Sequence, residues 1–400
     1  MTELSKARQL QQLFGQAATG SFNAYSRQVF GQLHRCHTVA NGVHSYRCSS
    51  EDCHHLHYQY HSCGNRHCPN CGGLKKEQWV ENLKAGLLPT GYYHVVFTLP
   101  QELHPLVLGN RQALFKLLFD AASGSLLQLA GDPQWLGGKC SITAVLHTWG
   151  QQLSFHPHLH CIVSDGGIDA DNHWIKAKRS NQSFLFPVNV LKVVYKGLFL
   201  KGLRQLVEQQ QLQCDGIPVE KVIRQAGYKK WNVYAKRPFG SVASVVEYLG
   251  RYTHKVAITA HRLVGVTEHR VLFNYRDYAD ANRQKQMALS AAEFLRRFEL
   301  HILPKRFVKI RHYGLLQNQG KTKRLNQVRS QLSLPPLAPR VQIPVTIRLL
   351  EKYGKDITRC PKCNNGKLVL IHIDYGYREF TRYKKRTLPG DEKTNARDPP

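Results

Sequence analysis

The sequence predicts an α+β protein in which a small metal-binding domain precedes a larger mixed domain. Strand-like runs rich in β-branched and aromatic residues are mixed with helical runs through the middle of the chain. Six of the eleven cysteines crowd between residues 36 and 71, a pattern typical of metal binding in a reducing compartment. The 400 residues, 42% of them hydrophobic, are enough for two or three domains with buried cores.

The first ninety residues are predicted to form a helix followed by a zinc-binding segment. Leu4, Leu10, Leu13 and Phe14 recur close to helical spacing, which indicates an amphipathic helix. A segment dense in cysteine and histidine follows, and the run LKKEQWVENLKAGLL after it again has helical periodicity. We therefore expect an N-terminal helix and zinc-binding domain over residues 1–90.

Residues 91–316 carry the pattern of the α+β core. Strands are predicted in YYHVVFTLP, SITAVLHTW, HLHCIVSDGG, KWNVYAKRPF and RVLFNYRDY, and helices in ALFKLLFDAASGSLLQLA, SVASVVEYLGRY and AAEFLRRFELHIL. Residues 317–340 are basic, polar and interrupted by prolines, which predicts a linker. Residues 341–400 are expected to form a small C-terminal module that ends in a disordered tail.

The charge of the chain favours a polyanionic partner. Lysine and arginine number 56 against 27 acidic residues, so the formal net charge is +29, and the basic residues recur along the whole chain. This distribution suits an extended nucleic-acid footprint. A membrane surface is the competing polyanion, but we find neither an uninterrupted apolar stretch long enough to span a bilayer nor the apolar centre of a signal peptide. We expect a soluble, intracellular protein that binds nucleic acid and no membrane.

The cysteine-rich segment is predicted to bind structural zinc. Cys68 and Cys71 form a C-x-x-C turn that points two thiolates at one ion, and Cys48 and Cys53 form a looser second pair. A site closed by four protein ligands leaves no open position for chemistry, so this zinc is expected to be structural. Further donors that could complete this site or hold a second ion are Cys36, His44, Cys63 and His67.

A late pair, Cys360 and Cys363, is half of a zinc ribbon. The sequence shows no second cysteine pair near it. Three possibilities are open: the pair uses His372, it takes a partner from elsewhere in the fold, or it binds nothing.

A cluster of histidines is predicted to hold a catalytic divalent ion. In LSFHPHLHCIVSDGG, His156, His158 and His160 alternate with other residues, so a strand would project them from one face. Pro157 suits only the first position of such a strand, which leaves His158 and His160 as the expected ligands. The ion would be Mg or Mn acting as a Lewis acid, with His156 or His254 as the third ligand. The alternative is a solvent-facing strand with a chance cluster among 21 histidines.

Two tyrosines are candidate nucleophiles. Tyr248 and Tyr252 lie four residues apart in SVASVVEYLGRYTHKVAIT, so a helix would place both phenols on one face. Aromatic residues at this spacing usually pack in a core, and periodicity alone favours that interpretation. Their combination with the histidine cluster favours catalysis.

Five motifs occur in an order that resembles one family, the insertion-sequence-91 type of transposase within the HUH (His-hydrophobe-His) single-strand endonucleases. The similarity runs from about residue 36 to 316 and is carried by YHSCGNRHCPNC, YYHVVFTLPQELHPL, FHPHLHCIVSDGG, EYLGRYTHKVAIT and LFNYRDYADANRQKQMALSAAEFLRRFELHILPKRFVKIRHYGLL. The resemblance implies that His158 and His160 form the HUH motif and that Tyr248 and Tyr252 are paired nucleophiles. It also implies a zinc-binding N-terminal domain and a catalytic domain built on an antiparallel sheet flanked by helices.

One motif departs from the family pattern. Four residues separate Cys48 from Cys53, whereas the resemblance leads us to expect a C-x-x-C there. The departure concerns the first zinc half-site and leaves the catalytic motifs intact.

The resemblance implies a transposase that nicks and rejoins single-stranded DNA at transposon ends through a covalent 5′-phosphotyrosine, as in rolling-circle transposition. Its partners would be those single-stranded ends and the target DNA, and the sequence leaves the oligomeric state open. The runner-up is a plasmid replication initiator or relaxase with the same HUH chemistry. A noncatalytic, zinc-dependent DNA-binding regulator would explain the charge and the cysteines, but not the histidines and the paired tyrosines.

Overall fold

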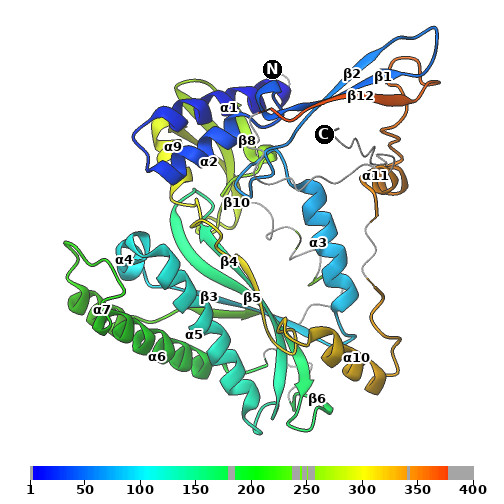
Figure 1. Ribbon diagram of the computed structural model, residues 1–400. Coiled ribbons are helices and arrows are strands. Elements are labelled where there is room, and N and C mark those ends of the chain that lie inside the picture. The colour runs from blue at the N-terminus through cyan, green and yellow to red at the C-terminus, as the bar shows by residue number, and fades with distance from the viewer. Residues whose placement is uncertain are drawn as a thin grey trace, which may run out of the picture. The chain divides into compact units, whose positions relative to one another are not determined.

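The structure is a computed structural model that describes residues 3–178, 185–236, 244–245, 250, 257–339 and 343–376. It divides into two compact units. The larger unit comprises Met1–His34 and Gly64–Gln342, and the smaller one comprises Arg35–Cys63 and Ile343–Pro400. The predicted α+β class, with antiparallel sheets flanked by helices, is confirmed (Figure 1). The units do not follow the predicted segments 1–90, 91–316, 317–340 and 341–400, because strand pairing joins residues far apart in the sequence.

A six-stranded sheet forms the centre of the larger unit. Its main path has the order β11-β4-β5-β3-β7, with β6 paired to β5, and its neighbouring strands are antiparallel. The longest strands are β4 and β5; β4 is almost entirely buried, and β5 is buried from Cys161 onward, which fits their dense apolar and β-branched sequence. The strands are β3 (Tyr92–Thr98), β4 (Lys139–Trp149), β5 (Phe155–Ile168), β6 (Trp174–Lys176), β7 (Val233–Lys236) and β11 (Ile310–Gly314).

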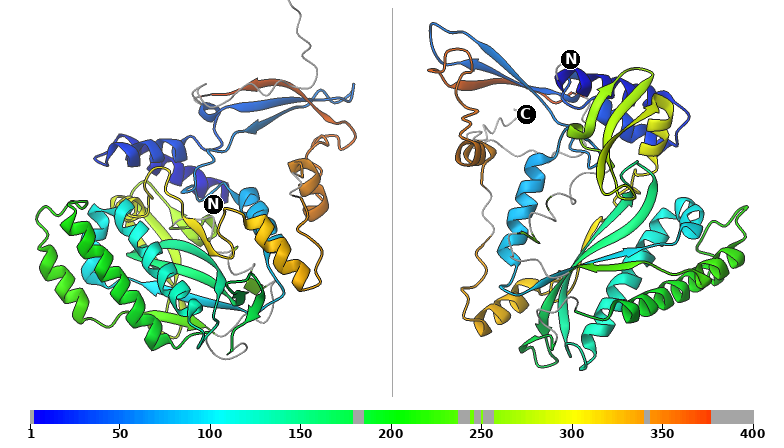
Figure 2. Two further views of the ribbon diagram at one scale, coloured as in Figure 1. Left: turned by 60° about the horizontal axis from the view of Figure 1, so that its bottom comes forward. Right: turned by 180° about the vertical axis from the view of Figure 1, so that it is seen from behind.

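Helices α4 to α7 cover one face of this sheet (Figures 1 and 2). Apolar side chains such as Phe97 of β3, Phe119 of α5 and Phe199 of α6 share one buried core there. By length and composition α5 could cross a membrane, but 61% of its apolar window is buried in this core, as in the central helix of a globular domain. The helices are α4 (His104–Gly109), α5 (Arg111–Gly131), α6 (Val188–Glu208) and α7 (Val219–Tyr228).

The opposite face of the sheet carries α3 (Gly73–Gly86), as the helical run after the cysteines predicts. Leu83 of α3 packs with Val145 of β4 and Ile162 of β5. Near the end of the sheet, α10 (Lys321–Gln331) buries Leu325 against Ile168. The predicted linker over 317–340 therefore contains a helix that packs on the larger unit, because its few apolar residues recur on one helical face.

A second sheet completes the larger unit, with the strand order β10-β9-β8. The predicted N-terminal helix is confirmed as α1, and Phe14 of α1 packs with Phe30 of α2 and Phe298 of α9. These elements are α1 (Glu3–Thr19), α2 (Ala24–His34), β8 (Leu263–Val266), β9 (Arg270–Asp277), β10 (Arg283–Ser290) and α9 (Ala291–Glu299).

The smaller unit contains a three-stranded antiparallel sheet with the order β12-β1-β2. The central strand comes from the N-terminal part of the chain, and one of its two neighbours comes from the C-terminal part. The elements are β1 (Val43–Cys48), β2 (Leu56–Tyr60), β12 (Leu368–Asp374) and α11 (Val345–Tyr353). Short 3-10 turns in the two units are η1 (Val39–Asn41), η2 (Gln101–Leu103) and η3 (Ala260–Arg262).

Candidate functional site

Adjacent strands of the central sheet bring three histidines together. His147 of β4 is the register partner of His158 of β5, and His160 follows on the same face of β5. Each of the three offers one ring nitrogen, and these nitrogens lie within 4.8 Å of one another. The arrangement can hold one metal ion and leaves positions for further ligands.

His147 joins His158 and His160 in this group, whereas the sequence suggested His156 or His254 as the third ligand. The histidine in SITAVLHTW is a buried polar residue in an apolar strand, a weak signal that gains meaning only from the β4–β5 register. The ladder shifts register between His147 and Trp149, so His156 lies beyond its regular part. His156 does not belong to the three-histidine group, and His254 lies outside the described residues.

Contacts of their ring nitrogens with neighbouring groups orient His158 and His160, the two histidines of the predicted motif. The ring Nδ1 of His158 donates a hydrogen bond to the carbonyl of His156 at 2.6 Å, which leaves its Nε2 as the nitrogen with a free lone pair in the neutral ring. The ring of His160 is parallel to that of His94 on β3, with 2.9 Å between His160 Nδ1 and His94 Nε2. Both ring orientations are thus set before any ligand arrives.

Burial keeps these imidazoles neutral. It lowers the pKa of His158 to about 4, and burial together with the charges of His158, His94 and Lys309 holds the pKa of His160 well below its ordinary value. Burial and the charge of Arg66 also lower the pKa of the Lys309 ammonium to about 7. Neutral imidazole is the form that binds metal, so the histidines are in the competent state at neutral pH.

The predicted nucleophiles Tyr248 and Tyr252 lie outside the described residues. Their described neighbour Val245 is fully buried and packs with Val145 and Ile162. Val145 and Ile162 each lie two residues from a member of the histidine group, on the same faces of β4 and β5. The segment that leads to the tyrosines therefore meets the sheet on the histidine-bearing face.

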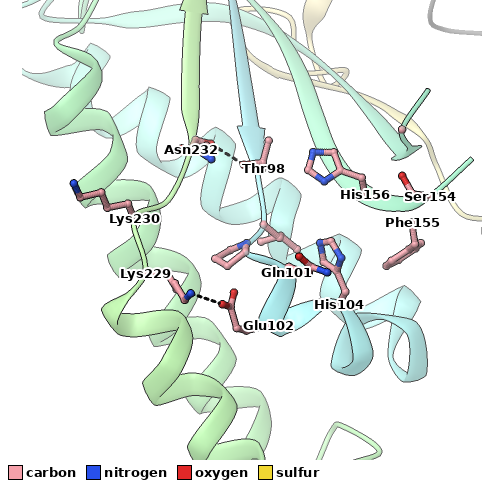
Figure 3. Close-up of a pocket in the computed structure, with 13 residues that line it drawn as sticks. Thr98, Gln101, Glu102, His104, Ser154, Phe155, His156, Lys229, Lys230 and Asn232 are labelled. Atoms are coloured by element: carbon pink, nitrogen blue, oxygen red, sulfur yellow. Dashed lines mark hydrogen bonds and ion pairs between the residues drawn. The ribbon is translucent and has the colours of Figure 1, made fainter. Parts of the chain in front are cut away.

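A cavity of about 570 Å³ opens where β3, β5 and β7 meet their loops (Figure 3). The ring of His104 makes edge contacts with Phe155 and His156, with ring centroids 5.6 and 6.1 Å apart. An ion pair of 3.1 Å joins Lys229 to Glu102 at the wall. The lining residues are Thr98, Leu99, Pro100, Gln101, Glu102, His104, Gly150, Ser154, Phe155, His156, Lys229, Lys230 and Asn232.

The cysteines of the smaller unit are grouped differently from the predicted pairing of Cys48 and Cys53 with Cys68 and Cys71. Cys48 Sγ lies 3.6 Å from Cys363 Sγ, and Cys53 Sγ lies 3.8 Å from Cys360 Sγ. All four sulfurs are within 4.8 Å of one another. The late pair thus has its partner elsewhere in the fold, and His372 is not part of this group.

Two further cysteine pairs are each close in space. Cys68 and Cys71, in the larger unit, are both buried and their sulfurs lie within 4.8 Å of each other. The sulfurs of Cys36 and Cys63, in the smaller unit, also lie within 4.8 Å of each other, and the Cys63 N–H donates to Cys36 Sγ at 3.3 Å. Each pair supplies two of the four ligands that zinc takes in structural sites.

His67 and His44, two of the possible extra ligands, belong to none of the groups of described residues that could hold a metal ion. His67 is buried, its Nδ1 donates to Asn65 Oδ1 at 2.8 Å, and its Nε2 accepts the N–H of Leu303 at 3.0 Å. Both ring nitrogens make hydrogen bonds, so His67 stabilises the loop that contains Asn65 and its contact with Leu303. Burial lowers the pKa of His67 to about 3. His44 packs edge-on against His61 on the small sheet and belongs to none of the metal-binding groups of the described residues.

Comparisons with known proteins point in one direction. Residues 141–324 match the family profile described as "Putative transposase", and residues 7–99 match the one described as "Transposase zinc-binding domain". The chain is similar to "Putative transposase y4qJ" of Sinorhizobium fredii (strain NBRC 101917 / NGR234), with 38% identity over 365 residues, covering 88% of this chain and 90% of that protein. It is also similar to "Transposase for insertion sequence element IS801" of Pseudomonas savastanoi pv. phaseolicola, with 30% identity over 337 residues, covering 82% and 79%. No solved structure matches the chain.

Proposed function

Because this chain belongs to the insertion-sequence-91 family of transposases, we propose that it nicks and rejoins single-stranded DNA at the ends of its element through a covalent 5′-phosphotyrosine. One observation carries the proposal. Three imidazoles, those of the buried His147 and the half-buried His158 and His160, converge on the sheet face against which Val245 packs. Such a cluster suits the binding of a divalent ion that activates a phosphate.

The donor set fits a divalent ion held by His147, His158 and His160. Imidazole nitrogens suit transition metals, whereas Mg²⁺ prefers oxygen ligands, so of the two expected ions the residues favour Mn²⁺. When bound, the ion supplies Lewis-acid polarisation of the scissile phosphate. His94 and the carbonyl of His156 hold the ligand rings in place from behind.

The nucleophile is a tyrosine hydroxyl from Tyr248 or Tyr252. Its oxygen loses its proton to solvent and forms a bond to phosphorus, the bond from phosphorus to the 3′ oxygen breaks, and the 3′ oxygen takes up a proton and leaves as a hydroxyl. The 3′ hydroxyl of another strand can reverse the attack and join, since the phosphotyrosine retains the bond energy. Two tyrosines allow two strand ends to be held at once.

The cavity beside His156 is suited to a nucleotide next to the scissile phosphate. Its volume of about 570 Å³ is in the range of small-molecule sites, and it begins two residues from His158. The rings of Phe155 and His104 offer surfaces on which a base can stack, and Lys230 offers charge for a phosphate. We expect Phe155→Ala to weaken binding of single-stranded DNA about tenfold or more, measured by fluorescence anisotropy. An unchanged affinity would contradict a nucleotide subsite there.

Two alternative functions compete with this proposal. A plasmid replication initiator or relaxase would use the same chemistry on a plasmid origin, and a zinc-dependent regulator would bind DNA without cutting it. The family assignment favours transposon ends over an origin. The three-histidine cluster favours cleavage over binding alone.

The decisive experiment is a cleavage assay on single-stranded oligonucleotides that carry the element ends. With Mn²⁺ we expect a covalent adduct that peptide mass spectrometry maps to Tyr248 or Tyr252. Phe at either position should leave some cleavage, and Phe at both should remove every adduct, because this change deletes only the hydroxyl. An adduct on any other residue, or cleavage by the double variant, would overturn the proposal.

A further inference from the structure

We infer that Cys48, Cys53, Cys360 and Cys363 hold one zinc ion, so that the C-terminal part of the chain completes the zinc-binding module. The family profile for the zinc-binding domain covers residues 7–99 and therefore includes only two of these ligands. The paired sulfurs of Cys48 and Cys363 are 315 positions apart in the sequence.

The sulfur positions match a tetrahedral zinc site. A Zn–S bond of about 2.3 Å implies sulfurs about 3.8 Å apart along each edge of the tetrahedron. The structure has 3.6 Å between Cys48 and Cys363 and 3.8 Å between Cys53 and Cys360. A disulfide would need about 2.0 Å, so these contacts are those of thiols or of ligands to a shared ion.

Backbone donors point at the sulfurs, as a thiolate requires. The N–H of Ser50 lies 3.4 Å from Cys48 Sγ, and the N–H of Gly366 lies 3.3 Å from Cys363 Sγ. Such hydrogen bonds stabilise the negative sulfur and fix its direction. One donor comes from each half of the site, so the two halves are built alike although they are distant in the sequence.

Gly366 shows how closely the two halves fit. A Cβ atom at this position would lie 2.3 Å from Cys48 Sγ and 2.9 Å from the nitrogen of Ser50. Only glycine allows the late turn to approach Cys48 in this way. The two turns are also joined by paired hydrogen bonds, from the Ser49 N–H to the Lys367 carbonyl at 2.8 Å and from the Lys367 N–H to Ser49 Oγ at 2.9 Å.

The sheet of the smaller unit explains why both halves are needed. Cys48 ends β1 and is the register partner of Leu368, the first residue of β12, so strand pairing brings the two cysteine turns to the same end of the sheet. Without β12, only the two-stranded β1–β2 ladder would remain, and such a ladder is marginal in water. A chain that stops before residue 343 would lose two ligands and the third strand together.

Zinc content of full-length variants tests the inference. Replacing Cys360 and Cys363 with Ser should remove one zinc per chain, and replacing Cys48 and Cys53 should remove the same one. The variant with all four changes should therefore lose no more zinc than either pair alone. A larger loss in the fourfold variant would show that the pairs hold different ions and would overturn the inference. Cys214→Ser, which changes a half-buried thiol outside the group, is the matched control and should keep its zinc.

The unaltered protein provides a second test that does not depend on how variants fold. Alkylation followed by mass spectrometry should find Cys48, Cys53, Cys360 and Cys363 protected in the zinc-loaded chain, and all four should become reactive together when a chelator is added. The reactivity of Cys214 should not respond to the chelator. Ready labelling of Cys360 and Cys363 in zinc-loaded protein in which Cys48 is protected would contradict the shared site.

Gly366→Ala tests the close fit itself. The added methyl collides with Cys48 Sγ, so we expect zinc to be released to a chelator about tenfold faster or more. Gly197→Ala is the control, because a Cβ there meets no atom within 4 Å. Equal release rates for the two variants would contradict the geometry on which the site depends.

Discussion

Two of the candidate metal sites among the described residues of this transposase, the histidine site and the cysteine site of the smaller unit, differ in ligand number and in how the chain assembles them. The histidine site has three described ligands from two adjacent strands, His147 on β4 and His158 and His160 on β5. The cysteine site of the smaller unit has four ligands from the two ends of the chain. Three ligands leave room for a substrate, whereas four close a tetrahedron. This difference is the reason we propose chemistry at the histidine site and a contribution to fold stability at the cysteine site.

The largest effect is expected at the histidine site. His160→Ala should lower strand cleavage by about three orders of magnitude, because losing the ion costs several kcal/mol of charge stabilisation in the transition state. Binding of single-stranded DNA should persist, since the basic surface supplies most of the affinity. Cleavage rates and anisotropy titrations measure the two effects. His269→Ala, at an exposed position of the larger unit, is the control. Undiminished cleavage by His160→Ala would remove the histidines from the mechanism.

The third ligand sharpens the comparison. His147→Ala should weaken Mn²⁺ binding about tenfold to a hundredfold, measured by calorimetry, because it deletes a ligand from the group. His156→Ala should leave Mn²⁺ affinity nearly unchanged, since the contact of His156 to His158 is made by its backbone carbonyl. The reverse ranking of the two variants would restore His156 as the ligand.

Zinc removal should affect the two regions unequally. In the variant with Ser at Cys360 and Cys363, amide hydrogens of β1 and β12 should lose protection from exchange, because structural zinc contributes folding free energy directly. Amides of β4 and β5 should keep their protection, since that sheet has its own apolar core. Hydrogen exchange read by mass spectrometry provides both readouts in one experiment. Equal loss in β4 and β5 would contradict two separately stabilised sites.

A further effect concerns the pH dependence of the stability of the larger unit. Burial lowers the pKa of His301 to about 4, and its ring is held by Thr148 Oγ1 and the Leu153 carbonyl, each at 3.2 Å. His301 takes up a proton near pH 6.5 in the unfolded chain but only near pH 4 in the folded chain. Its contribution to the free energy of unfolding is therefore fully present above pH 6.5 and falls as the pH drops toward 4. The loss is about 3 kcal/mol at most.

His301→Gln should flatten this dependence in urea unfolding followed between pH 7 and 4, because glutamine does not titrate. His269→Gln, at an exposed position of the larger unit, is the control for the substitution itself. If the free energy of unfolding of the His301→Gln variant falls with pH as steeply as that of the unaltered protein, the lowered pKa of His301 does not cause the pH dependence.

Local patterns in the sequence determined much of this protein. The alternation of His158 and His160 placed both on one strand face, and the spacing of Leu10, Leu13 and Phe14 predicted a helix that buries them. The C-x-x-C spacing placed the sulfurs of Cys68 and Cys71 close together. These features depend on periods of two or 3.6 residues and on single turns, which neighbouring residues specify by themselves.

Only the tertiary structure decided which distant residues meet. The β4–β5 register added His147 to the histidine cluster, and the pairing of β1 with β12 placed Cys360 and Cys363 beside Cys48 and Cys53. Spacing along the chain had instead suggested His156 or His254 as the third metal ligand. It had also paired Cys48 and Cys53 with Cys68 and Cys71. The physical reason is that strand pairing depends on the burial of whole sheet faces. The residues next to a given position in the sequence do not specify which strand will lie beside it in the sheet.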